Sequence, residues 1–338
     1  MTTGNRQPAL GNRKNLKLGS LGLCATLFAL SIPAGAQQSK KVHLIGILRN
    51  DTPTLFASRN QALRQGLHEL GYVDGENIRF EYRYAERNLN RLPELAAELV
   101  GLKVDVIVVG GGTTSVARKA TTTIPIVVGS AGDLVGGGHV ASLARPGENV
   151  TGSTDISPDL SGKRLEVLRD ILPKAARVAV LSSGSKSDLD EVRQTEAAAP
   201  HLGLKVNGIT VRNRNEFAGA YEKINKQQAN AIIFIQSGET LPHRKELSEL
   251  AARHRLPSMC ETSVWTEDGC MMNYGPDLLY LWRRAATYVD KILKGAKPGE
   301  LPVEQPTKFE MVINLQSAKR IGVTIPPNVL ARADRVIK

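Results

Sequence analysis

The stretch from residue 103 to residue 133 constrains the fold more than any other part of this 338-residue chain. A largely β-branched run at residues 104–109 is followed by three glycines and a short helix-compatible segment, and a second apolar run lies at 124–128. Short apolar runs of this kind are typical of strands buried on both faces. The order of strand, loop, helix and strand predicts a parallel sheet, in which ligands bind beyond the carboxyl ends of the strands.

The alternation of apolar runs and amphipathic segments occurs twice along the chain. The first series runs from a strand at residues 42–48 to a strand at 124–128, and we expect a helix at 135–143 and an extended segment at 150–153 after it. The second series runs from a strand at 177–181 to a strand at 257–260, and we expect a further strand at 270–274 after it. Each series reads β-α-β-α-β-α-β, which predicts an α/β fold with two doubly wound parallel-sheet lobes.

The first 36 residues have the order of a secretory signal peptide. Four Lys and Arg residues precede or enter an apolar stretch that continues to Ile32, and Ala34 and Ala36 form an A-x-A site. The apolar part is short for a membrane span. We therefore expect cleavage after Ala36 and export of residues 37–338. An uncleaved anchor helix is the alternative.

Two cysteines, Cys260 and Cys270, remain after that cleavage. An oxidising compartment permits a disulfide. Their spacing places them at a return between two neighbouring strands, so we expect their Cα atoms within disulfide reach, about 4.4–6.8 Å. Whether they form a bond or stay as two free thiols is left open by the spacing.

Composition argues against several classes of function. The net charge is +11, but the basic residues are spread along the chain and only 4% of residues are aromatic, so we expect no nucleic-acid partner. The histidines lack metal-ligand spacing, which predicts no metal site. Gly110 and Gly112 approach the dinucleotide pattern, but Ser115 replaces its third glycine, so we expect no cofactor and no catalytic residue.

The glycine-rich loop at residues 110–114 is the best candidate for binding an anion. Thr113 and Thr114 follow a strand and begin a helix, where free N–H groups and the helix dipole favour negative charge. We expect this loop to hold a carboxylate or a similar group of a small solute, with Arg49 as a charge partner from the first strand's loop. Helix capping is the alternative role for each hydroxyl.

Several motifs together resemble one family, the ABC-transporter substrate-binding proteins whose better-known members are tryptophan- and tyrosine-type binders. The resemblance covers residues 42–338, and its most specific part is the segment 142–152, SLARPGENVTG. The other motifs that carry it lie at residues 65–72, 75–78, 91–96, 123–127, 274–278 and 301–309.

The resemblance implies the type I periplasmic-binding fold. Lobe 1 would comprise residues 42–154 plus 275–300, lobe 2 would comprise 155–274 plus 301–338, and three crossings, expected near 153–157, 262–267 and 274–277, would form a hinge. It further implies a monomeric periplasmic protein without catalysis that binds a solute between its lobes and delivers it to an ABC permease in the inner membrane. A ligand-binding partner of a sensory receptor and a secreted α/β enzyme are the alternatives.

The family's usual binding segments fall on strand-end loops of this sequence. Gln236 and Ser237 stand where amino-acid-binding members tend to carry an acidic residue, so we expect a small polar or anionic solute, possibly amino-acid-like, and its identity stays open. The expected ligand-binding residues are Arg49, Thr52, Gly112, Thr113, Thr114, Ser130, Asp133, Ser153, Thr154, Ser183, Gln236 and Ser237.

Overall fold

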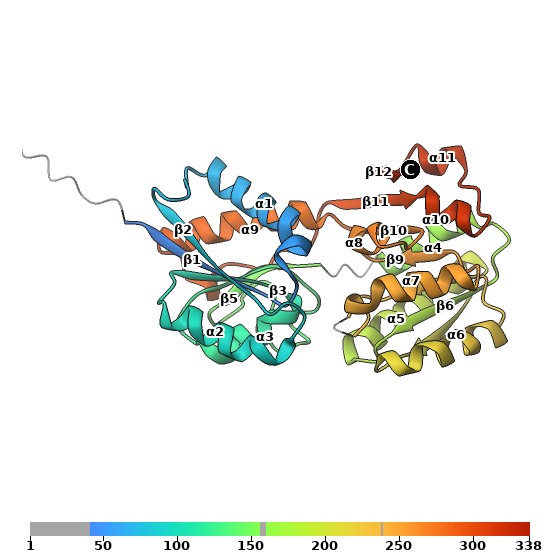
Figure 1. The fold of residues 1–338 in the computed structure, drawn as a ribbon, viewed down its shortest axis with the longest axis horizontal. Coiled ribbons are helices and arrows are strands. Elements are labelled where there is room, and N and C mark those ends of the chain that lie inside the picture. The colour runs from blue at the N-terminus through green and yellow to red at the C-terminus, as the bar shows by residue number, and fades with distance from the viewer. Residues whose placement is uncertain (1–40, 156–159, 238) are drawn as a thin grey trace, which may run out of the picture. The chain divides into compact units, whose positions relative to one another are not determined.

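A computed structural model describes residues 41–155, 160–237 and 239–338. The predicted signal peptide lies outside these residues. Two α/β lobes are present, each built on its own sheet (Figure 1).

The first sheet has five parallel strands in the order β2-β1-β3-β4-β5. Apolar runs such as Ile45–Ile47 and the valines of β3 are buried on both faces, as parallel strands covered by helices require. The strands are β1 (His43–Arg49), β2 (Ile78–Tyr84), β3 (Val106–Gly110), β4 (Ile126–Ala131) and β5 (Val150–Thr154).

Two pairs of helices cover the first sheet. Helices α1 (Pro53–Glu69) and α9 (Leu278–Leu293) share a core with β1 on one face, and Trp282 is the largest side chain buried in it. Helices α2 (Leu92–Gly101) and α3 (Gly111–Ala120) cover the other face. Figure 1 shows the two pairs on opposite sides of the sheet.

The second sheet has seven strands in the order β12-β11-β10-β9-β8-β6-β7. β11 runs antiparallel to β10, so this sheet is mixed at one side although the five strands from β10 to β7 are parallel. The strands are β6 (Arg177–Ser182), β7 (Lys205–Thr210), β8 (Ala231–Phe234), β9 (Ser258–Cys260), β10 (Met272–Pro276), β11 (Phe309–Asn314) and β12 (Arg335–Ile337).

Helices also cover both faces of the second sheet. One core contains α4 (Leu160–Ile171), α5 (Lys186–Ala198), α10 (Leu315–Arg320) and α11 (Pro327–Leu330). The opposite core contains α6 (Phe217–Lys226), α7 (Arg244–Arg253) and α8 (Ser263–Glu267). Short 3-10 helices η1 to η5 lie at Leu89–Arg91, Ala199–Leu202, Arg214–Glu216, Leu241–His243 and Pro298–Glu300.

The chain passes between the sheets three times. It leaves the first sheet after Thr154, returns after Pro276 to form α9, and leaves again before β11. Residues 262–267, where we expected a crossing, instead form α8 and its N-cap within the second lobe. The limits of the lobes also differ from the expected ones. β10 of the second sheet extends through Pro276. Residues 301–304 lie against the first sheet, where Glu304 N–H donates to Gly152 O.

Residues 135–143 do not form the expected helix. The segment is a series of turns, in which the backbone N–H groups of His139 and Val140 both donate to Leu134 O. Three consecutive glycines at 136–138 disfavour a helix, and the carboxylate of Asp133 accepts from the N–H of Val135 and of Gly136.

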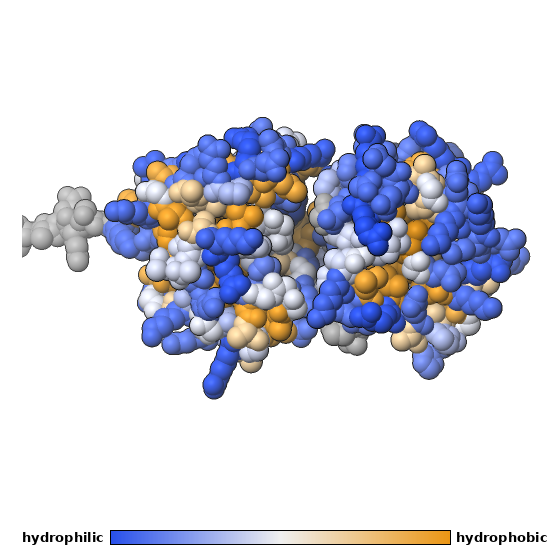
Figure 2. All heavy atoms as spheres, turned by 90° about the horizontal axis from the view of Figure 1, so that it is seen from below, coloured by the Kyte–Doolittle hydropathy of each residue, from blue (hydrophilic) through white to orange (hydrophobic). Residues whose placement is uncertain are grey.

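The visible surface is mainly hydrophilic, with apolar residues in separate patches (Figure 2). Within the parts of the chain that the structure describes, no helix is long and apolar enough to cross a membrane.

Candidate functional site

The strand order of the first sheet places its topological switch point between β1 and β3, where open α/β sheets generally bind ligands. In an order such as 2-1-3-4-5, successive connections leave β1 on opposite sides, and the loops after β1 and β3 diverge at this switch point. Arg49 ends β1 and Gly110 ends β3, so the two predicted loops meet here.

Two arginines share one carboxylate after β1. Arg49 donates to Asp51 through Nε at 3.2 Å and through Nη2 at 2.7 Å, while Nη2 of Arg59 lies 3.5 Å from Asp51 Oδ2. Burial, and then the charge of Arg49, lower the pKa of Arg59 to about 10 against the opposing charge of Asp51. Two cations and one anion leave a surplus positive charge at this edge of the sheet.

Aromatic rings and the glycine loop hold the guanidinium of Arg49 in place. Its Cζ lies 4.4 Å from the centre of the Phe56 ring and 5.0 Å from that of Trp282. A Cβ atom at Gly110 would collide with Nη1 of Arg49, so glycine is what allows the arginine to lie over the loop. In the same way, a Cβ at Gly112 would lie 2.7 Å from the side-chain nitrogen of Asn50. Sequence reasoning missed Asn50 and Arg59.

The hydroxyl groups of Thr113 and Thr114 face the protein backbone. Thr113 Oγ1 is 3.1 Å from Leu48 O and accepts from Gly110 N–H at 3.2 Å, and Thr114 Oγ1 donates to Gly110 O at 3.1 Å. Both residues are buried. The hydroxyls therefore brace β1, β3 and α3, and the groups left to meet an anion are the N–H groups at the start of α3.

The remaining predicted residues of this lobe have side chains that hydrogen-bond within the protein, except Ser153. Ser130 Oγ donates to Asp155 Oδ2 at 2.7 Å, and Thr154 Oγ1 donates to Gly132 O at 2.9 Å. Thr52 caps α1 by accepting from Leu55 N–H, and Asp133 closes its turn. Ser153 is fully buried and its Oγ has no hydrogen-bond partner among the described residues.

The second sheet repeats the same order in β7-β6-β8-β9-β10, which places its switch point between β6 and β8. Ser183 follows β6, and its hydroxyl and N–H donate to Asp188, so it braces the start of α5. Ser237 follows β8 and forms a turn with Thr240. The three predicted residues Ser183, Gln236 and Ser237 thus lie at the carboxyl edge, as expected, although two of them support local turns.

Gln236 belongs to a network that sequence reasoning missed. Its backbone N–H donates to Glu261 Oε2 at 2.6 Å, and its side-chain oxygen accepts from Thr262 and Trp265. Glu261 follows β9, one strand beyond the position where the amino-acid-binding proteins that this sequence resembles tend to carry an acidic residue. Its place directly after a strand was the signal that could have identified it.

Arg164 of α4 lies at the centre of this acidic network. Its Nη1 is 2.9 Å from Glu261 Oε1 and also hydrogen-bonds Glu191 of α5, while its Nε donates to Tyr274 O at 2.9 Å. Burial and the charge of Glu191 raise the pKa of Glu261 well above its usual range, against the attraction of Arg164. One cation thus faces two carboxylates.

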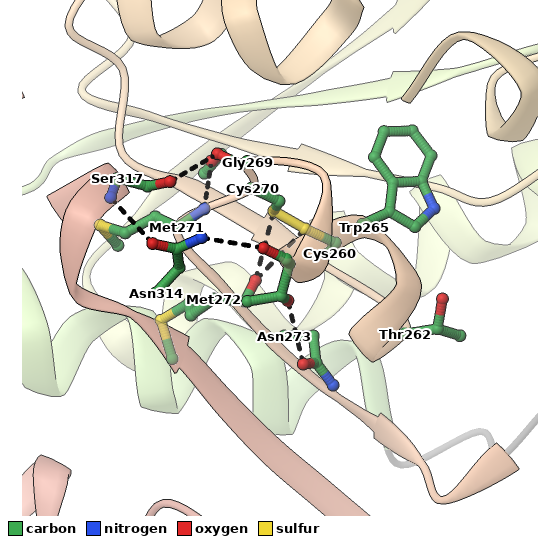
Figure 3. The surroundings of a disulfide bond; sticks show 12 residues. Cys260, Thr262, Trp265, Gly269, Cys270, Met271, Met272, Asn273, Asn314 and Ser317 are labelled. Carbon is green, nitrogen blue, oxygen red and sulfur yellow. Dashed lines mark hydrogen bonds between the residues drawn. A yellow bond between two sulfur atoms is a disulfide. The ribbon is translucent and has the colours of Figure 1, made fainter. Parts of the chain in front are cut away.

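A disulfide fixes the loop that carries Glu261. Cys260 and Cys270 are bonded, with their Cα atoms 6.7 Å apart, which confirms the expected proximity and resolves the open alternative. Figure 3 shows Asn314 and Ser317 of the neighbouring segments reaching the same loop, with Ser317 Oγ donating to Gly269 O at 2.9 Å. Both cysteines are buried.

Other features lie apart from these edges. A cavity of about 600 Å³ runs along the edge strand β2, lined among others by Arg64, Asp74 and Phe80. Within residues 41–155, 160–237 and 239–338, no group of His, Cys, Asp and Glu is arranged to hold a metal ion.

Comparison with known proteins identifies relatives of the whole folded region. A family model described as "ABC transporter substrate binding protein" matches residues 42–337. A tyrosine-binding protein from Clostridioides difficile strain R20291 is 25% identical over 296 residues, which cover 84% of this chain and 82% of that protein.

Two solved structures share the fold over 88% of this chain and 100% of their own length. One is a conserved domain protein from Vibrio cholerae, with a TM-score of 0.78 and 28% identity. The other is an ABC domain from Streptococcus pneumoniae in complex with L-Trp, with a TM-score of 0.78 and 24% identity.

Proposed function

Because the chain belongs to the family of ABC transporter substrate-binding proteins, it is a solute-binding protein that delivers a small solute to a membrane permease, and we propose that it does so without catalysis, as an exported periplasmic monomer. The order of the signal-peptide features in residues 1–36 supports export. N-terminal sequencing of the exported protein is expected to begin at Gln37.

The solute binds, in our proposal, at the carboxyl edges of the two sheets, and an anionic group of it lies at the start of α3. The observation that carries this proposal is the switch point of the first sheet, where the guanidinium of Arg49 lies over Gly110 and the side chain of Asn50 lies over Gly112. The N-terminus of α3 and a surplus positive charge would then both attract an anion to the same place. Tyrosine and tryptophan, bound by relatives, both carry a carboxylate that this arrangement suits.

Delivery follows from a change in the hinge. We propose that the three crossings mark the limits of the two lobes. The lobes close on the solute, and the permease recognises the closed form. The solute stabilises that form only by its differential affinity for it. Small-angle scattering is expected to give a smaller radius of gyration with bound solute, and an unchanged radius at saturation would contradict closure.

Binding itself is tested on the exported protein. Native mass spectrometry is expected to show one small molecule per chain, and calorimetry with that molecule is expected to give saturable one-to-one binding. Gly112→Ala places a methyl group against Asn50 in the proposed anion site, and we expect it to weaken binding about tenfold. Gly101→Ala, where a Cβ meets nothing within 4 Å, is the matched control and is expected to change nothing in binding.

A further inference from the structure

The outer edge of β2 is open to another strand. Among the described residues β1 is the one strand that pairs with β2, and Figure 1 shows β2 at the margin of the first sheet beside α1. The preceding loop covers only the start of this edge, where Gly75 N–H donates to Ile78 O at 2.9 Å. Beyond Ile78, no backbone group of the described residues bonds to the outer edge. An edge of this kind is a template for pairing with another chain.

The pairing with β1 determines which residues of β2 face outward. Asn77 O accepts from β1 at one end, and Ala85 N–H donates to β1 at the other, so the odd-numbered residues between them bond to β1. Alternate residues of a parallel strand bond to the neighbour on the same side. The N–H and C=O groups of Phe80, Tyr82 and Tyr84 therefore point away from the sheet.

The side chains of the same three residues form an aromatic row on the face of α1. The rings of Phe80 and Tyr82 are stacked with their centroids 6.0 Å apart, and so are those of Tyr82 and Tyr84. All three residues are half-buried. The cavity of about 600 Å³ lies between this strand and α1, where Asn60 and Gln61 also line it. Every second side chain of a strand added to β2 would enter this cavity.

The other face of β2 carries alternating charges. Arg79, Glu81 and Arg83 point to the side of α2, where Nε of Arg83 lies 2.5 Å from Glu98. Arg83 also contacts Glu81 and donates to Tyr82 O at 2.9 Å, a half-buried contact that an added strand would replace. Arg79 is exposed and has no ion-pair partner among the described residues. Opposite charges are favoured directly across a strand pair, so the complement of this face is acid, base, acid.

We propose that the outer edge of β2 binds an extended segment of another polypeptide, which pairs antiparallel with residues 80–84 as a further strand of the first sheet. A row of unpaired backbone groups at two-residue spacing is matched by another backbone, and the alternate side chains of that segment supply the specificity. The segment carries apolar residues towards the cavity and an acid-base-acid pattern on its other face. This site lies on the side of the sheet, away from its carboxyl edge, and goes beyond the proposed solute binding.

Designed peptides test the site on the exported protein. A capped heptapeptide of sequence VEVKVEV has the complementary pattern, and VKVEVKV has the inverted charges with the same apolar residues. Calorimetry is expected to give saturable one-to-one binding of the first peptide and at least about tenfold weaker binding of the second. Equal affinities, or no binding of VEVKVEV, would overturn the proposal.

Two N-methylated forms of VEVKVEV separate backbone pairing from charge. In the proposed register the valines exchange hydrogen bonds with the outward-facing residues of β2, while the N–H group of the central lysine points away. Methylation at the nitrogen of the valine before the lysine is expected to weaken binding at least about tenfold, and methylation at the lysine nitrogen is expected to have little effect. Because both forms carry the same charge, equal losses would contradict pairing at this edge.

Charge reversal in the protein locates the site. Arg79→Glu is expected to weaken binding of VEVKVEV at least about threefold and to strengthen that of VKVEVKV. Lys119→Glu reverses an exposed base on α3, away from β2, and is the control that is expected to change neither affinity. Wild-type affinities in Arg79→Glu would contradict the assignment. Sedimentation of the protein alone completes the test, since a dimer that Arg79→Glu dissociates would assign the edge to a second copy of this chain and overturn the proposal.

Discussion

Nη1 of Arg164 lies 2.9 Å from Oε1 of Glu261, and the two side chains are only 4% and 12% exposed. Glu191 contacts the same guanidinium from α5. Two carboxylates compete for one buried cation. The net charge of this cluster therefore depends on pH.

The stability of the protein is expected to depend on pH. Burial and Glu191 raise the pKa of Glu261, so the folded protein holds this proton more tightly than the unfolded chain does. Any contribution to stability is therefore full at low pH and is lost as pH rises from the ordinary pKa towards the raised one. Chemical denaturation across this pH range is expected to show the loss in the wild-type protein and not in Glu261→Gln, and an identical pH dependence in the two proteins would contradict the raised pKa of Glu261.

Replacing Thr113 and Thr114 together by Val is expected to destabilise the protein. Both hydroxyls are buried and bonded to backbone groups of β1 and β3, so their loss costs about 1–3 kcal/mol of the free energy of unfolding. Chemical denaturation measures this. The exposed Thr122→Val is the control, expected within about 0.5 kcal/mol of the wild type. If the double variant kept its stability but lost solute binding, the two hydroxyls would be assigned to the anion site instead.

Gly152→Ala is expected to be severely destabilising. Gly152 has φ of +133°, and a Cβ there would collide with the backbone oxygen of Val128 in β4. Strain and collision together predict a loss of at least about 2 kcal/mol. Gly101→Ala, at the end of α2 in open space, is expected to be neutral or to stabilise by about 0.5–1 kcal/mol. Thermal unfolding of both variants compares the two cases, and equal melting temperatures would refute the expectation.

The disulfide is expected to contribute to the stability of the protein. The double variant Cys260→Ser and Cys270→Ser removes a link across ten residues, which predicts a loss of about 2–4 kcal/mol. Reducing agent should lower the stability of the wild type and leave the double variant unchanged, and a thiol count on the denatured, unreduced protein should find none free.

The sequence predicted those parts of the fold that have a strong local pattern. The strands that begin the two series were expected at residues 42–48 and 177–181 and lie at His43–Arg49 and Arg177–Ser182, because short apolar runs mark buried strands. The prediction of a helix at residues 135–143 was wrong. Apolar residues at both ends suggested a helix, but the three glycines and Asp133 favour turns. The small helix at Ser263–Glu267 was missed because five residues carry too little periodicity.

The carboxyl edges of the sheets were predictable, but the contacts among the side chains there were not. Strand-end position alone placed Arg49, Gln236 and the glycine loop at or just beyond the carboxyl ends of their strands. Which groups already hold one another depends on distant contacts, such as that of Arg164 in α4 with Glu261 after β9, and no local pattern encodes these. The hydroxyl of Thr113 is a similar case, because its contact is with Leu48 of another strand.

A crystal structure of the exported protein with its co-purified solute tests the central claim most directly. The account predicts that the solute lies at the carboxyl edges of the sheets, with an anionic group against the N–H groups at Gly111 and Gly112. A solute bound instead in the cavity along β2, or one that contacts neither edge, would contradict it.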